Sequence, residues 1–323
     1  MPIGVIELHK IIKSVVILTF FILASCSEPN KTQALRIGTN LWPGYEPLYL
    51  AREQGYFNSE KIRLIEYTSA SQVIKAYKNG LIDAAAVTLD EAIALLASGE
   101  QPQIVLVMDI SNGADVVLGQ PSVKKITDIK GSRVGVEHTA LGAYFINRVI
   151  EKSGIDKSDI TVVPLTVNQH ERAFLNKKVD AVLTFEPVRS KLINAGANIL
   201  FDSSQIPGEI VDVLIVDASK LTDFKEHIKH LEAGWFKALD DVNRKDEKTI
   251  KLLGVRMKIG SEDVLGAYEG MILPSQKMND SLIYAGLEPE PGLMSSTRRL
   301  SQVMYENKLI STQVNTEKLF IKK

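Results

Sequence analysis

LRIGTNLWPGYEPLYLAREQGYF, residues 35–57, contains a short apolar strand, an aromatic loop and an amphipathic helix in that order. The strand begins at Leu35, and Pro47 suits the first turn of the helix after the loop. Gly55 lies just past the end of that helix, where glycine is a common terminator. This order of elements predicts the start of an α/β fold.

The same alternation continues along the chain and then restarts. Thr88 and Glu91 have the spacing of a capping box at the start of one helix. The run 115–119 leads away from the first series of strands, and the run 210–216 is placed to return to it. The remaining apolar runs predict strands at 62–67, 84–87, 104–107, 133–136, 161–163, 181–183 and 199–201. After Lys220 the apolar spacing is helical.

The length of the chain favours two lobes over one. The roughly 300 residues after the N-terminal signal exceed a typical single domain of about 100 to 150 residues. We expect lobe I to comprise 35–112 and 217–323, and lobe II to comprise 113–216. Each lobe is expected to be a mixed sheet flanked by helices.

The N-terminal segment has the order of a secretory signal. Lys10 and Lys13 precede the apolar run 15–26, which ends in small residues and is too short to remain as a membrane span. Leu23-Ala24-Ser25-Cys26 resembles the lipobox of bacterial lipoproteins, in which the cysteine is acylated and becomes the first mature residue. We expect a signal peptide at 1–25, a lipidated tether at 26–34, and a lipid-anchored protein in the periplasm or on the extracellular face.

Composition excludes several classes of function. The chain has 38 basic and 39 acidic residues, so no overall field favours nucleic acid. Cys26 is its one cysteine, so the mature fold has no internal disulfide. No later apolar run approaches the roughly 20 residues of a membrane span. We expect a monomer with no cofactor whose hydrophobic core alone holds the fold.

Polar and aromatic side chains come directly after five of the predicted strands. Ligands of open α/β sheets bind at the carboxyl ends of strands, beside helix N-termini. Each of these side chains also has a purely structural explanation, because Ser and Thr cap helices, aromatic rings fill loop cores, and a carboxylate suits a helix N-terminus. The candidates are Asn40, Trp42, Tyr45, Ser69, Thr88, Asp90, Glu91, Thr139 and Glu186.

Four stretches together resemble the periplasmic substrate-binding proteins of the nitrate, sulfonate and taurine ABC transporter group, which also includes thiamine-precursor binders. They are 37–57, 73–87, 126–136 and 179–187. The resemblance implies a two-lobe clamshell of type II-like topology, an SsuA/THI5-like domain. Such a protein closes on a small molecule and delivers it to a membrane permease.

The resemblance also implies ligand contacts near Trp42, Tyr45, Ser69, Thr88, Thr139 and Glu186. Asp90, Glu91 and Glu186 add carboxylates near the expected binding site, where an anion would need positive charge. The segments that contain these residues have no obvious Arg or Lys side chain to hold an anion. We therefore expect a small neutral, zwitterionic or amine-bearing ligand more than a simple inorganic anion. The candidate ligands are a sulfonate, a taurine-like molecule, a pyrimidine or another small zwitterion or amine. Trp42 is expected to stack on the ligand, and Glu186 to accept hydrogen bonds from it.

Other functions remain open at this point. The related thiamine-pyrimidine synthases depend on a histidine and cysteines, and the mature chain lacks a free cysteine, so we expect no enzyme. His227 and His230 have helical spacing, but charged neighbours indicate a solvated face rather than a metal site. A ligand-sensing lipoprotein that reports to a membrane receptor would need the same cleft and anchor. Ser27 in place of an aspartate leaves an outer-membrane destination open.

Overall fold

The computed structural model describes residues 33–284 and 292–321. The expected signal peptide and the acylated Cys26 lie outside the described residues. The chain divides into two units, Met1–Ala34 and Leu35–Lys323. All the described strands and helices belong to the second unit, which is compact.

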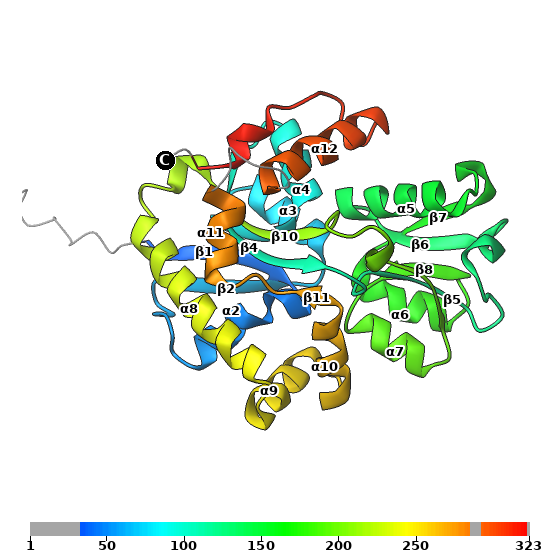
Figure 1. Ribbon diagram of the computed structural model, residues 1–323, viewed down its shortest axis with the longest axis horizontal. Helices are drawn as coiled ribbons and strands as arrows, with labels where there is room; N and C mark the ends of the chain where they lie inside the picture. The colour runs from blue at the N-terminus through cyan, green and yellow to red at the C-terminus, as the bar shows by residue number, and fades with distance from the viewer. Residues whose placement is uncertain (1–32, 285–291, 322–323) are drawn as a thin grey trace, which may run out of the picture. The chain divides into compact units, whose positions relative to one another are not determined.

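The first sheet is mixed and contains six strands (Figure 1). Its strands are β1 (Leu35–Asn40), β2 (Ile62–Tyr67), β3 (Ala84–Thr88), β4 (Pro102–Ser111), β10 (Val211–Asp217) and β11 (Met271–Ile272). Their order is β11-β4-β10-β3-β1-β2. β1 runs parallel to β2 and β3, whereas β10 is antiparallel to β3 and β4. The parallel strands come from the alternating strand and helix units that the sequence predicts.

The second sheet is a five-stranded mixed sheet. Its strands are β5 (Val116–Gly119), β6 (Arg133–Glu137), β7 (Thr161–Leu165), β8 (Ala181–Thr184) and β9 (Asn198–Asp202), in the order β7-β6-β8-β5-β9. β6 runs parallel to β7 and β8, and β5 is antiparallel to β8 and β9. The two mixed sheets confirm the expected two-lobe α/β architecture.

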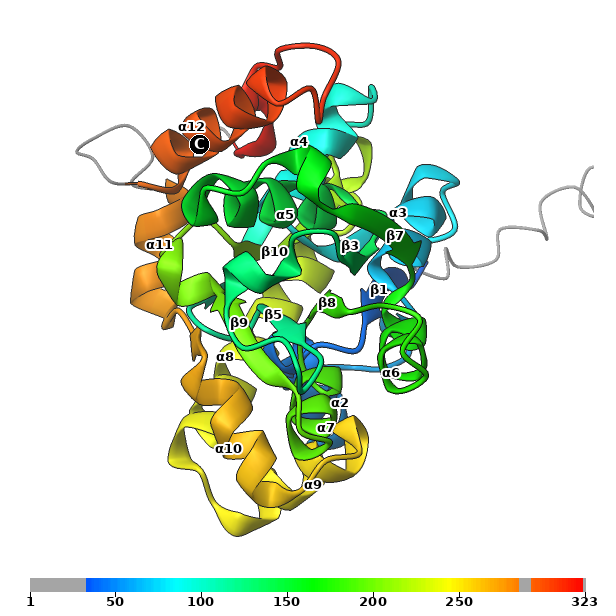
Figure 2. The ribbon, with the colours of Figure 1, turned by 90° about the vertical axis from the view of Figure 1, so that its right-hand side faces the viewer.

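Helices cover both sheets. In the second lobe, α5 (Ala140–Ser153) covers one face of the sheet, while α6 (Val167–Leu175) and α7 (Val188–Asn194) cover the other (Figures 1 and 2). The first lobe contains α2 (Glu46–Glu53), α3 (Ala70–Lys78), α4 (Leu89–Ala97), α8 (Lys225–Arg244), α9 (Glu247–Met257), α10 (Ser261–Glu269), α11 (Gln276–Tyr284) and α12 (Leu293–Glu306). In the described part of the chain, none of the helices is both long and apolar enough to span a bilayer.

The C-terminal helices return to the first lobe, as the helical spacing after Lys220 indicates. Trp235 of α8 is fully buried in the core that includes Leu48 of α2. Arg256 of α9 donates a 2.5 Å hydrogen bond from Nε to Oε2 of Glu46, at the start of α2. Apolar burial and this ion pair therefore hold the late helices against the first strand and helix of the chain.

The chain crosses between the lobes after β4 and before β10. The two crossings are tied together, because the hydroxyls of Ser111 and Ser203 lie 2.7 Å apart and Ser203 also accepts a hydrogen bond from the backbone of Gly113. β10 pairs with β3 and β4 of the first sheet, although the expected boundary at 216 leaves it in lobe II. Backbone pairing thus places most of the return crossing inside the first lobe.

A candidate ligand-binding pocket between the lobes

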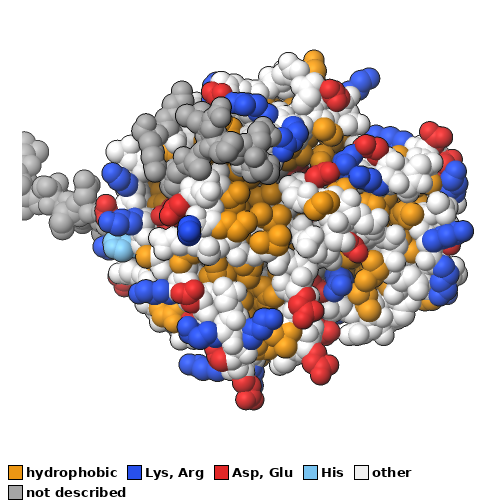
Figure 3. Space-filling model, viewed as in Figure 1, with side chains coloured by type: hydrophobic (Ala, Val, Ile, Leu, Met, Phe, Trp, Pro, Cys, Tyr) orange, Lys and Arg blue, Asp and Glu red, His pale blue; other side chains and the backbone are white. Residues whose placement is uncertain are grey.

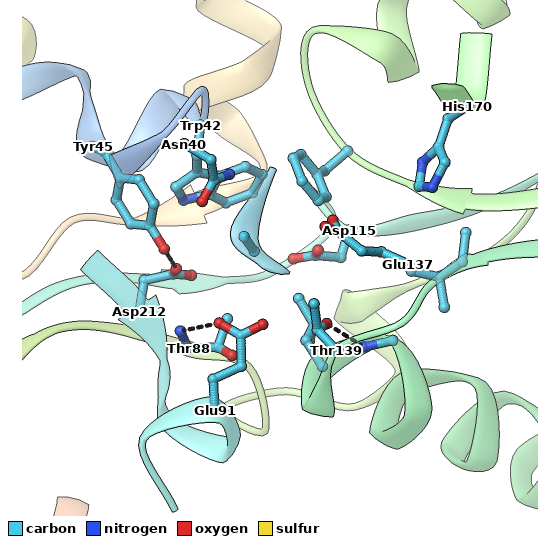
Figure 4. Close-up of a pocket in the computed structure, with 15 residues that line it drawn as sticks. Asn40, Trp42, Tyr45, Thr88, Glu91, Asp115, Glu137, Thr139, His170 and Asp212 are labelled. Atoms are coloured by element: carbon cyan, nitrogen blue, oxygen red, sulfur yellow. Dashed lines mark hydrogen bonds between the residues drawn. The ribbon is translucent and has the colours of Figure 1, made fainter. Parts of the chain in front are cut away.

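One pocket is lined by residues of both lobes (Figure 4). The first lobe contributes aromatic and acidic side chains from the ends of its strands, and the second lobe closes the opposite wall. The lining residues are Asn40, Trp42, Tyr45, Ala70, Thr88, Glu91, Asp115, Glu137, Thr139, Leu141, Gly142, His170, Leu183, Phe185 and Asp212. The structure therefore brings together the strand ends at which the sequence predicts a ligand.

Four predicted contacts line this pocket, and three do not. Trp42, Tyr45, Thr88 and Thr139 are lining residues. Ser69, Asp90 and Glu186 are buried outside its lining.

Trp42 is fixed by a carboxylate behind it. Its indole Nε1 donates a 2.9 Å hydrogen bond to Oδ2 of Asp109 on β4. Gly44 lies against the same pair, and a Cβ at this position would overlap both Asp109 Oδ2 and Trp42 Nε1. The glycine is therefore needed for the close approach of the loop to β4, and this approach sets the direction of the indole ring.

The Trp42 ring also meets the second lobe. Its centroid lies 5.3 Å from that of Phe185, and the two rings are almost perpendicular, at 88°. An edge-to-face pair of this kind contributes beyond its buried area. The aromatic contact joins the two walls of the pocket at one end.

A row of polar side chains crosses three neighbouring strands of the first sheet. Asp212 on β10 is the register partner of Thr88 on β3 and of Asp109 on β4. The hydroxyl of Tyr45 donates to Oδ1 of Asp212. Burial raises the pKa of Asp212 well above its usual value, and the charge of Asp109 adds to the rise. Two carboxylates side by side in a sheet repel each other when both are ionised.

Glu91 and Asp115 each present an unpartnered oxygen to the pocket. Glu91 accepts a 3.2 Å hydrogen bond from the backbone of Thr88 at Oε2, as the capping-box spacing predicts, but Oε1 has no partner among the described residues. Oδ1 of Asp115 likewise has none. Burial raises the pKa of Glu91 to about 8 and that of Asp115 to about 6. Figure 4 shows both carboxylates directed into the space between the lobes.

Glu137 and Thr139 form the facing wall in the second lobe. Glu137 Oε1 accepts a 2.9 Å hydrogen bond from the hydroxyl of Ser71, which lies on α3 of the first lobe. Burial raises the pKa of Glu137 above its usual value. Thr139 caps α5, because its hydroxyl accepts a 3.2 Å hydrogen bond from the backbone of Gly142. Thr139 therefore has the capping role that its position predicts and also lines the pocket.

His170 is the one histidine in the pocket lining. Burial lowers the pKa of His170 to about 4, so the ring is neutral at physiological pH. Nδ1 lies 3.2 Å from the hydroxyl of Thr184, and Nε2 has no partner among the described residues. The ring can accept or donate one hydrogen bond but brings no positive charge to the site.

The three predicted residues outside the pocket lining differ in their surroundings: Ser69 and Glu186 form hydrogen bonds with nearby side chains, and the carboxylate oxygens of Asp90 form none of normal geometry among the described residues. Ser69 is fully buried, and its hydroxyl lies 3.0 Å from that of Ser71. Both oxygens of Asp90 are buried without partners in the described chain, and burial raises its pKa to about 7. Glu186 accepts hydrogen bonds from the Ser190 backbone at 3.1 Å, the Ser190 hydroxyl at 2.9 Å and Arg189 at 3.0 Å. Its carboxylate therefore binds donors in the first turn of α7, and Glu186 is not among the residues that line the pocket.

The electrostatic character of the pocket differs from that of the surface. Lys, Arg, Asp and Glu side chains are interspersed on the face shown in Figure 3. The pocket lining, in contrast, has four carboxyl side chains and includes neither Lys nor Arg among the described residues. Among the same described residues, no group of three or more His, Cys, Asp or Glu side chains is placed to hold a metal ion.

A family model of the NMT1-like family matches residues 28–253. The chain belongs to the NMT1-like family. A protein of Bacillus subtilis (strain 168), named for aliphatic sulfonate binding, is 24% identical over 289 residues, which cover 79% of this chain and 86% of that protein. The relatives are binding proteins rather than enzymes, in agreement with the expectation of no catalytic role.

Two solved structures share the fold of this NMT1-like protein. The aliphatic sulphonate-binding protein SsuA of Escherichia coli has a TM-score of 0.71 at 20% identity, with 89% of this chain and 97% of that chain covered. The alkanesulfonate-binding SsuA of Xanthomonas axonopodis pv. citri, bound to MOPS, has a TM-score of 0.72 at 20% identity, with 90% and 97% covered. The NMT1-like chain therefore has the periplasmic-binding-protein fold.

Sequence reasoning missed several acidic residues of the NMT1-like pocket. Asp115, Glu137 and Asp212 line it, and Asp109 supports Trp42 from behind. A signal was present for two of them, because Asp109 and Asp212 interrupt apolar strands that are otherwise buried. Carboxylates are rarely buried without a partner or a function.

Proposed function

We propose that this protein is an extracytoplasmic, lipid-anchored solute-binding protein that captures a small organic molecule between its lobes and delivers it to an ABC permease. It acts as a monomer attached to the membrane through acylated Cys26. The observation that carries the proposal is the pocket itself, because residues from both lobes line it and carry unpartnered polar atoms. Concave sites with a few convergent polar groups are typical of small-molecule binding.

The connections between the lobes support a closing motion. Ser71 contacts Glu137 across the pocket, and Trp42 contacts Phe185. A ligand bound to both walls would add contacts that exist only when the lobes are together. Hinge closure around a ligand is an established motion of two-lobe binding proteins.

The ligands that appear in the names of the related proteins must be tested before they are assigned to this protein. The Bacillus subtilis protein is named for aliphatic sulfonates, and the Xanthomonas structure contains MOPS. A sulfonate would meet Glu91 and Asp115 here, without a Lys or Arg side chain from the described lining. A sulfonate would bind only while these carboxyl groups keep their protons, whereas a solute with a positive group can also pair with their ionised form. We therefore propose a neutral, zwitterionic or amine-bearing solute.

A thermal-shift screen tests solute binding directly. The folded full-length protein in detergent is exposed to sulfonates, amino acids, pyrimidines, polyamines and inorganic anions. A ligand bound only by the native state raises the melting temperature, by an amount that grows with its concentration relative to Kd. We expect at least one of these classes to stabilise the protein. No shift with any class, with folding confirmed by circular dichroism, would overturn the proposed function.

The anchor is tested separately. Metabolic labelling with palmitate is expected to mark the natural protein and not Cys26→Ser. A single acyl chain binds membranes only marginally, so stable anchoring needs more than one chain. Labelling that persists in Cys26→Ser would remove the anchor from the proposal while leaving solute binding unaffected.

A further inference from the structure

We infer that the pocket selects a small organic cation, in which a protonated nitrogen is attached to an apolar or aromatic body. This inference rests on the proposed function and specifies the class of solute. Glu91 Oε1 and Asp115 Oδ1 would receive the positively charged N–H groups, and Trp42, Tyr45 and Phe185 would contact the body of the molecule.

The two acceptor oxygens are buried. Glu91 is 2% exposed and Asp115 is 1% exposed, yet Glu91 Oε1 and Asp115 Oδ1 each form no hydrogen bond of normal geometry among the described residues. The hydroxyls of Thr139 and Ser111 lie near enough only to oppose part of the rise in the pKa of Glu91 and of Asp115, respectively. A buried acceptor without a donor is costly, and an ionised one is more costly. A ligand that brings N–H donors removes this cost. A ligand that brings only acceptors leaves it in place.

The ionisable side chains around the site are mostly acidic. Asp212 and Glu137 also line the pocket, and Asp109 lies directly behind Trp42. No described lining residue is Lys or Arg, and His170 is neutral. In a site shielded from water, charges interact more strongly than at the surface. A positive ligand group is therefore favoured over a negative one, because it stabilises the ionised form of these carboxyl groups.

The lining of the pocket fits an organic cation better than a metal ion. The described residues contain no group of three or more His, Cys, Asp or Glu side chains placed to hold a metal. The pocket instead has aromatic walls at Trp42, Tyr45 and Phe185. Aromatic faces attract organic cations and bury the apolar part of the same molecule. Carboxylates beside aromatic rings match a molecule with both features.

Binding of a cation should also release protons from the pocket. Burial raises the pKa of Glu91 to about 8 and that of Asp115 to about 6. A cation favours the ionised form of both carboxyl groups, so its binding near neutral pH releases protons. The other titratable groups around Glu91 and Asp115 are the uncharged Tyr45 hydroxyl, the neutral His170 ring and four further carboxyl groups. These carboxyl groups belong to Asp90, Asp109, Glu137 and Asp212.

Matched probes test the inference. We use three sets of compounds, built on a phenyl, a pyrimidine or a butyl body. In each set the body carries an aminomethyl, a hydroxymethyl or a methanesulfonate (–CH₂SO₃⁻) group. Calorimetry on the full-length protein in detergent at pH 8 is expected to give at least one aminomethyl compound a Kd about tenfold or more below those of its two partners. The heat measured in buffers of different ionisation enthalpy should show proton release at pH 7.

Variants locate the effect. Glu91→Gln keeps an oxygen for the Thr88 backbone, as a capping box allows, and Asp115→Asn keeps the side-chain shape. Each variant is expected to raise the Kd of the aminomethyl compound at least tenfold and to reduce the proton release that accompanies its binding. Glu232→Gln is the matched control, because burial also raises the pKa of Glu232, to about 7, but this residue lies on α8 outside the pocket lining. The Kd of the Glu232→Gln variant for the aminomethyl compound should be unchanged.

The possible failures separate the two proposals. Preferential binding of the methanesulfonate compounds would overturn the cation and leave solute binding intact. Aminomethyl binding that survives both Glu91→Gln and Asp115→Asn, with native circular dichroism, would overturn the assigned acceptors. If no probe binds but the wider screen finds a stabilising solute without a positive charge, only the cation is overturned. If the wider screen also finds nothing, both proposals are overturned.

Discussion

The hydroxyl of Ser71 donates a 2.9 Å hydrogen bond to Oε1 of Glu137, and the two residues belong to different lobes. The Ser71 backbone N–H points to the same oxygen, at 3.3 Å. Ser71 lies in the first turn of α3, and Glu137 ends β6. A carboxylate of the second lobe is thus held at a helix N-terminus of the first, where the helix dipole favours negative charge.

Ser71→Ala is expected to weaken ligand binding without unfolding the protein. The substitution removes a hydrogen bond to a carboxylate that forms only when the lobes meet, which is worth about 1–2 kcal/mol or about 5- to 30-fold in Kd. Calorimetry with the most stabilising compound of the screen measures the change. Ser98→Ala is the control, because it removes a 2.9 Å hydrogen bond to the Leu95 carbonyl away from the pocket. Equal Kd values for the two variants would contradict the role given to Ser71.

The empty protein is expected to lose stability as the pH rises from 6.5 to 8.5. The folded-state pKa is about 7 for Asp90 and Asp109 and about 8 for Glu91, above the unfolded values of about 4. The folded state therefore binds more protons, and the resulting stability is lost as the pH rises through these values. We expect the free energy of unfolding in urea to fall by about 1–3 kcal/mol.

The pH window is chosen because His170 acts in the opposite direction at lower pH. Its folded-state pKa of about 4 lies below the unfolded value of about 6.5, so its contribution grows with pH only up to that value. Glu91→Gln should flatten the decline between pH 6.5 and 8.5. A free energy of unfolding that rises over this interval in the natural protein would show that the buried carboxyl groups are ionised already.

Gly44→Ala is expected to reduce ligand affinity by about tenfold or more. The added Cβ would overlap Asp109 Oδ2 and Trp42 Nε1, so the indole or the loop must move, and small misplacements in a packed site are costly. The matched control is Gly266→Ala on α10, where a Cβ would meet no atom within 4 Å. That variant should bind normally and gain about 0.5–1 kcal/mol of stability. Normal binding by Gly44→Ala would mean that the position of Trp42 is not critical.

Glu186→Ala is expected to affect stability more than binding. The variant leaves the backbone N–H of Ser190 and the guanidinium of Arg189 without their carboxylate partner, which costs about 1–3 kcal/mol. Urea unfolding and calorimetry on the same sample separate the two effects. A large increase in Kd with unchanged stability would instead support Glu186 as the ligand contact that the sequence predicts.

The order of elements could be predicted because it depends on local patterns. The strand at Leu35 and the helix at Pro47 can be predicted from periodicity and turn residues, and the Thr88 and Glu91 pair from capping. β11 lies where the spacing predicts only helices. It is two residues long, and so short an edge strand leaves little periodicity to detect.

The sequence does not predict which buried acidic residues lie next to one another, because that depends on strand neighbours that lie far apart in sequence. Asp109 and Asp212 are register partners, yet about a hundred residues separate them along the chain. The role of Glu186 as a ligand contact stays a prediction, although Glu186 is not among the residues that line the pocket. A carboxylate at a helix start has a nearby local partner, here the Ser190 backbone.

The carboxyl groups of Asp109, Asp115 and Asp212 lie where the chain passes between the lobes, so the proposed charge recognition and the proposed lobe movement share the same strands. A molecule without positive charge would enter this space and leave the mutual repulsion of the acids unrelieved. Discrimination between solutes would then take place at the closing step as well as at entry. Under the proposed function, a permease that recognises only the closed form would reject such molecules without contacting them.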